Sequence, residues 1–114
     1  MQRYCLALDL KDDEQLIKQY EEHHKNVSKE IIKSITGSGI IALDIYRTGN
    51  RLMMIMKVSD DFSFEKKAAM DAANEHVQRW EDLMWQFQQA LPWAKRGEKW
   101  ILMDNIFSLP EESV

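Results

Sequence analysis

The chain has 114 residues, with 15 basic and 19 acidic side chains, which give a formal net charge of −4 when the three histidines are neutral. This length predicts a single domain over residues 1–114, and the acidic balance argues against a nucleic-acid binder, which usually carries a basic surplus. No apolar run approaches the roughly 20 residues of a membrane helix, and the one cysteine, Cys5, cannot form an internal disulfide. With no signal-peptide pattern at the N-terminus, we expect a reducing, cytoplasmic setting.

The first predicted elements are a strand and a long helix. Residues 3–10 alternate between a leucine-rich face and a face of smaller side chains, which is typical of a strand. From Glu14 to about Thr36 the apolar positions recur every three or four residues, so we expect one amphipathic helix of about 20 residues. A Gly37-Ser38-Gly39 segment ends it. The apolar stripe consists of Leu16, Tyr20, His24, Val27, Ile31 and Ile35.

A hairpin and a second helical region follow. Residues 40–46 and 52–58 have β-like patterns, and the linker between them contains Gly49 and Asn50, which favours a hairpin. In the first of these strands we expect Ile41, Leu43 and Ile45 to lie on the face opposite Ile40. Residues 64–91 are predicted to be helical, in one or two pieces ending before Pro92, and residues 100–109 to form a last strand before an acidic tail over 110–114.

The predicted order is therefore β-α-β-β-α-β, which is the ferredoxin-like arrangement of the α+β class. Its antiparallel sheet carries the helices on one face. The opposite face would present methionine, isoleucine and aromatic side chains, which water solvates poorly. We therefore expect a homodimer in which the two sheets pack together, a dimeric α/β barrel.

Tyr20 and His24 are the first candidates for chemistry. Their spacing of four residues places them one turn apart on the apolar face of the helix. Such a pair can be an acid–base pair in a lined pocket, or a core histidine hydrogen-bonded to a core tyrosine. Periodicity alone favours the second interpretation. His23 points about 100° away from His24, so the two cannot easily chelate a metal together, and we expect no metal site.

Trp80 lies on the apolar stripe of the second helical region, and it and the following residue Glu81 are further candidates. A tryptophan there is either core or a wall against which the C–H face of a sugar packs. Glu81 is either a second acid–base group or a surface carboxylate.

Several segments along the chain form an ordered pattern. The first helix carries the tyrosine and histidine, Gly39 precedes a strand, and a tryptophan lies on the second helix. The segments are Tyr20-Glu21-Glu22-His23-His24, Glu30, Gly39, Ile45-Tyr46, Val77-Gln78-Arg79-Trp80 and the closing run 99–109. Together, and over nearly the whole chain, they resemble the L-rhamnose mutarotase family of small α+β enzymes.

This resemblance implies a site. It implies that His24 is the proton donor, that Tyr20 holds the sugar and that Trp80 lines the sugar site. The family's aromatic residue on the second strand is Leu43 here, and its second tryptophan is Glu81. Relatives acting on L-fucose resemble the ending at residues 97–100, so both L-fucose and L-rhamnose are candidate substrates.

The resemblance implies an isomerase that interconverts the α and β anomers of a 6-deoxy-L-sugar by opening and closing the ring. This reaction requires no metal, redox cofactor or covalent intermediate, so the expected partners are a monosaccharide and a second copy of the chain. Because a fold does not fix a function, two alternatives stay open. One is a cofactor-free or haem-dependent monooxygenase of the dimeric α/β barrel type, and the other is a non-catalytic sugar-binding module.

Overall fold

A computed structural model describes residues 2–110 of the chain, so most of the predicted acidic tail, residues 111–114, lies outside the described residues. In chain order the elements are β1 (Gln2–Leu10), α1 (Glu14–His23), α2 (Lys29–Gly37), β2 (Ile40–Thr48), β3 (Arg51–Val58), α3 (Phe64–Ala72), α4 (Glu75–Trp85), β4 (Gln88–Gln89) and β5 (Ile101–Leu102).

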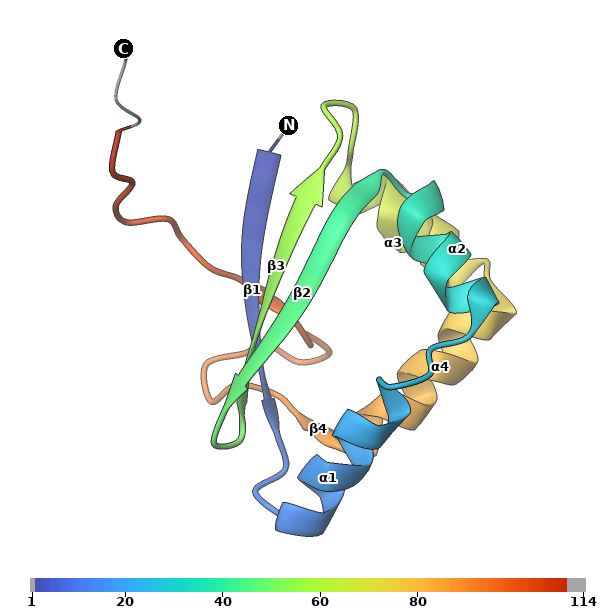
Figure 1. Cartoon of the computed structure of the whole chain (residues 1–114), viewed down its shortest axis with the longest axis vertical. Helices are drawn as coiled ribbons and strands as arrows, with labels where there is room; N and C mark the ends of the chain where they lie inside the picture. Colours follow the sequence, from blue (N-terminus) through green and yellow to red (C-terminus); the bar gives the residue numbers. More distant parts are fainter. Residues whose placement is uncertain (1, 111–114) are drawn as a thin grey trace.

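The strands form one antiparallel sheet in the order β2-β3-β1-β4, with β5 also paired to β1. β1 lies at the centre and pairs with β3 along almost its whole length, from Gln2 opposite Val58 to Asp9 opposite Arg51. The helices lie on one side of this sheet, and the C-terminal segment extends away from them (Figure 1). This arrangement confirms the predicted ferredoxin-like fold. None of the helices in the described part of the chain is long and apolar enough to cross a membrane.

The predicted hairpin is present and has a tight turn. Thr48 pairs with Arg51, and Gly49 has a φ of +55° at the first turn position, as type II′ turns require. The tip is tied to the end of β1, because Asn50 Nδ2 donates to Leu10 O at 3.1 Å and Leu10 N donates to Asn50 O at 2.6 Å.

A bulge changes which side chains of β2 face the helices. The register shifts between Ile40 and Ala42, so one extra residue separates the two ends of the strand. Ile40 is therefore buried in the same cluster against which Leu43 packs, and the prediction that they lie on opposite faces is wrong. The other buried members of that cluster are Leu6, Met56 and Val58.

The predicted first helix is wrong in one respect: it is two helices. α1 ends at His23, with His24 as its C-cap, and α2 begins at Lys29. Ser28 separates them, because its extended backbone cannot continue a helix and its side chain accepts a hydrogen bond from Ile31 N.

The second helical region is also divided, at Asn74, whose side chain caps α4. The helical region ends at Trp85 rather than near Pro92, because the following residues pair with the free edge of β1 and form β4. There Lys11 N donates to Phe87 O at 2.8 Å. Unsatisfied backbone groups at a strand edge favour such pairing over another helical turn.

The predicted last strand is much shorter than expected. Only Ile101 and Leu102 pair with β1, and Met103 N adds a hydrogen bond of 2.7 Å to Cys5 O. The chain from residue 104 to residue 110 then leaves the sheet, which exposes large apolar side chains, including Ile106 at 95% and Phe107 at 76%.

Candidate active site

The space between the sheet and the helices contains a cavity with two adjoining chambers. The histidine chamber, of about 320 Å³, is bordered by Tyr20 and His24. The α3 chamber, of about 260 Å³, is bordered by Lys67, Asp71 and Glu81. Small-molecule sites begin at about 300 Å³, so the two chambers together are large enough for a monosaccharide. Both are lined by Ile31, Ile35, Leu43, Met54, Trp80, Met84, Gln88 and Trp100.

His24 lies at the end of α1, partly buried between two aromatic rings. Its ring centroid is 4.5 Å from that of Tyr20 and 5.3 Å from that of Trp80. Its Nδ1 is 2.8 Å from the backbone oxygen of Tyr20. A carbonyl oxygen can only accept, so Nδ1 carries a proton. This contact differs from the hydrogen bond between the two side chains that a core pair would make.

Tyr20 is buried on α1, with only 4% of its surface exposed. Burial raises the pKa of its phenol to about 12, and a hydrogen bond from the Gln88 side chain offsets part of that effect. The hydroxyl is therefore neutral at physiological pH and can still donate a proton in a hydrogen bond.

The remaining predicted site residues border the same cavity from two elements, β2 and α4. Leu43 reaches both chambers from β2, and Trp80 reaches both from α4. Glu81 borders only the α3 chamber, while its backbone oxygen accepts a hydrogen bond of 3.3 Å from Lys99 Nζ. The structure thus places all the predicted site residues at one cavity: Tyr20, His24, Leu43, Trp80 and Glu81. Their roles in binding or converting a sugar remain predictions.

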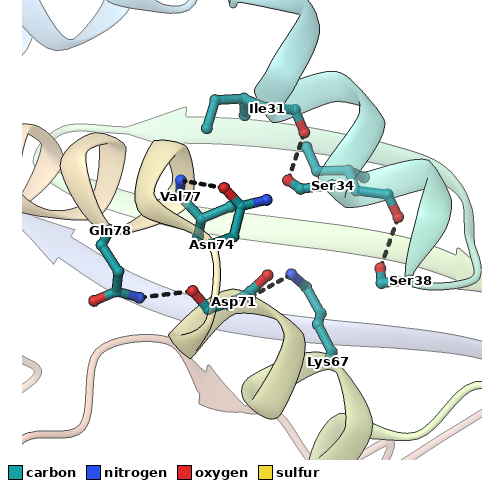
Figure 2. Close-up of polar contacts among 9 residues, drawn as sticks. Ile31, Ser34, Ser38, Lys67, Asp71, Asn74, Val77 and Gln78 are labelled. Atoms are coloured by element: carbon teal, nitrogen blue, oxygen red, sulfur yellow. Dashed lines mark hydrogen bonds and ion pairs between the residues drawn. The ribbon is translucent and has the colours of Figure 1, made fainter.

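The α3 chamber has a polar wall (Figure 2). Lys67 Nζ lies 2.7 Å from Asp71 Oδ2, and their side chains are only 23% and 17% exposed. Gln78 donates to the backbone oxygen of Asp71 at 2.9 Å, which ties the start of α4 to the end of α3. Ser34, on the facing helix α2, donates to Ile31 O. This wall places polar groups on one side of a mainly apolar space.

The other histidines lie elsewhere. His23 is exposed, with its ring centroid 5.4 Å from that of Phe87. His76 lies on the surface of α4, with Nδ1 3.2 Å from an Arg79 nitrogen. Neither borders either chamber, so His24 is the histidine that the cavity presents.

Sequence reasoning missed Gln88 and Trp100, which border both chambers. Gln88 lies off the apolar stripe of the helix predicted for residues 64–91, and only its place in β4 turns it toward the cavity. The sequence places Trp100 at the start of the predicted last strand and within the closing residues that resemble the family, and neither observation assigns it to the site. Its aromatic side chain just before a pairing segment was the available signal.

Comparison with known proteins decides the family. A family model described as L-rhamnose mutarotase matches residues 3–109. The chain belongs to the L-rhamnose mutarotase family. Mutarotases are carbohydrate isomerases, so the prediction of an enzyme of this class is confirmed. A sequence relative supports the assignment: an L-fucose mutarotase from Xanthomonas campestris pv. campestris is 48% identical over 97% of this chain and 90% of the relative. The chain is also similar to a UPF0734 protein from Dictyostelium discoideum, 36% identical over 93% of this chain and 88% of that protein.

Solved structures agree with this assignment of the fold. An L-rhamnose mutarotase from Formosa agariphila superposes with a TM-score of 0.71 at 22% identity, covering 96% of this chain and 100% of that one. The tetracenomycin F2 cyclase from Streptomyces glaucescens has a TM-score of 0.59 at 13% identity, covering 96% and 100%. At these identities the likeness concerns the fold alone, and the cyclase shows that this fold serves other chemistry too.

Proposed function

We propose that this mutarotase-family protein, as a single domain, interconverts the α and β anomers of a 6-deoxy-L-sugar. L-fucose is the first candidate substrate and L-rhamnose the second. The order follows from the relative named L-fucose mutarotase, which is 48% identical over nearly the whole chain. The proposed chemistry rests on one observation. The His24 ring lies between the rings of Tyr20 and Trp80 at the wall of a cavity of sugar size.

The reaction needs two proton movements and no net change in composition. Ring opening removes the proton from the anomeric hydroxyl and delivers one to the ring oxygen, which breaks the bond between that oxygen and the anomeric carbon and forms a free aldehyde. The aldehyde rotates, and the reverse steps close the ring on its other face. A positioned acid–base group accelerates such steps by about 10²–10⁴-fold.

His24 is suited to this role by its fixed tautomer. Because Nδ1 donates to Tyr20 O, Nε2 of the neutral ring carries the lone pair. Nε2 is then the atom that takes a proton from the sugar and returns one. The carbonyl also holds the ring orientation, which keeps Nε2 in place through both steps.

The rest of the cavity suits the other parts of such a sugar. Trp80 offers an aromatic face for the sugar's C–H groups, and Leu43 offers an apolar surface for the C6 methyl group. The neutral Tyr20 hydroxyl can donate to a sugar oxygen, because its pKa of about 12 keeps it protonated. Glu81 is the proposed polar contact in the α3 chamber.

The test is NMR saturation transfer between anomers of L-fucose and L-rhamnose, with the uncatalysed exchange subtracted. We expect His24→Asn to remain folded but to lower the enzyme-catalysed exchange rate by about 10²–10⁴-fold. This loss is equivalent to about 3–5 kcal/mol of transition-state stabilisation. His23→Asn and His76→Asn are matched controls outside the cavity and should stay within about tenfold of wild type. A folded His24→Asn with most of its activity would contradict the proposal, as would a wild type that binds sugar without accelerating exchange.

A further inference from the structure

Gln88 is a buried polar residue with an unused hydrogen-bond acceptor at the cavity. The residue is only 6% exposed, and its side-chain oxygen Oε1 makes no hydrogen bond with any described residue. Buried polar atoms nearly always have a partner, since an unpaired one loses its hydration without compensation. Because Gln88 borders a ligand-sized cavity, its unpaired oxygen points to a ligand group that pairs with it.

The surroundings of Gln88 limit where its side chain can lie. Its backbone is held in β4 opposite Leu10, so the side chain starts from a rigid position. The side chain reaches the Tyr20 phenol, whose pKa it lowers. The same side chain borders both chambers, and its Oε1 has no hydrogen-bond partner among the described residues.

We propose that Gln88 Oε1 accepts a hydrogen bond from a non-anomeric ring hydroxyl of the sugar, which makes Gln88 a specificity-determining residue. This inference rests on the proposed mutarotase function. An amide oxygen can only accept, and a sugar hydroxyl is a donor, whereas the C6 methyl group of a 6-deoxy sugar is not. The candidate donors are the hydroxyls on C2, C3 and C4, whose axial or equatorial orientation distinguishes L-fucose from L-rhamnose at C2 and C4.

The expected effect is large because a sugar lacking the correct hydroxyl leaves Oε1 unpaired. Sites built to pair with a substrate hydroxyl discriminate strongly against analogues without it. A single neutral hydrogen bond of this kind corresponds to about 10- to 100-fold in kcat/KM.

The experiment compares wild type with Gln88→Met, which keeps an unbranched side chain of similar size but removes the acceptor. Gln89→Met is the matched control, since Gln89 is the exposed neighbour on the same strand. Exchange is measured for the preferred sugar and for its 2-deoxy, 3-deoxy and 4-deoxy analogues. We expect Gln88→Met to lower kcat/KM about 10- to 100-fold for the parent sugar and for two of the analogues. For the analogue that lacks the paired hydroxyl, kcat/KM should hardly change.

A measurement on wild type keeps the inference testable if Gln88→Met does not fold. The side-chain amide resonance of Gln88 should shift when the parent sugar is added and should not shift with the one deoxy analogue. An equal loss on every sugar would overturn the inference and assign Gln88 a role through Tyr20 alone, and unchanged activity would overturn it as well. Failure of the proposed function is a separate result, because wild type would then accelerate the exchange of no sugar in the panel.

Discussion

Replacing Tyr20 with phenylalanine should remove a loss of stability at alkaline pH. The pKa of the Tyr20 phenol rises from 10.0 to about 12 on folding because the side chain is buried. At about 1.36 kcal/mol per pKa unit, this difference corresponds to about 3 kcal/mol. Below pH 10 the phenol is neutral in both states, so the full stability is present. As the pH rises from 10 to 12, the unfolded chain loses the proton first, and the free energy of unfolding falls.

The assay is urea unfolding of wild type and Tyr20→Phe at pH 8, 9, 10 and 11. At pH 11 the linkage relation gives a loss of roughly 1 kcal/mol for this group in wild type and none in the variant. At pH 8 the variant should be less stable by about 0.5–1.5 kcal/mol, because the hydrogen bond from Gln88 is gone. The two stability curves should therefore approach each other as the pH rises. A difference that stays constant to about 0.3 kcal/mol from pH 8 to pH 11 would refute the reasoning.

Two further predictions concern specificity and assembly. The double variant Leu43→Tyr with Glu81→Trp adds aromatic side chains to the walls of the chambers and should shift preference toward L-rhamnose in anomer-exchange assays. If the sugars keep the wild-type ranking, these positions do not set specificity. We also expect a homodimer, because the C-terminal segment exposes Ile106 at 95% and Phe107 at 76%, more apolar surface than water solvates well. Sedimentation at micromolar concentration should give twice the chain mass of 13.5 kDa, and a monomer would contradict this.

The sequence by itself determined the features that depend on local periodicity. Alternation placed β1 and β3, since side chains in a strand point to opposite faces in turn. The Gly49-Asn50 pair predicted the hairpin, because a positive φ costs glycine little. Tyr20 and His24 lie at helical spacing on an apolar stripe, and that pattern already placed them against the sheet. The ferredoxin-like order followed from these elements.

The break at Ser28 has a local cause, because its side chain caps a new helix although the apolar stripe runs through it without interruption. Only the tertiary structure decided where the second helical region ends. After Trp85 the helical pattern continues, but the free edge of β1 offers backbone hydrogen bonds that a further turn could not match. That competition between distant segments turns Gln88 into the cavity. No local sequence pattern reveals this competition, since the partner strand lies almost 80 residues earlier in the chain.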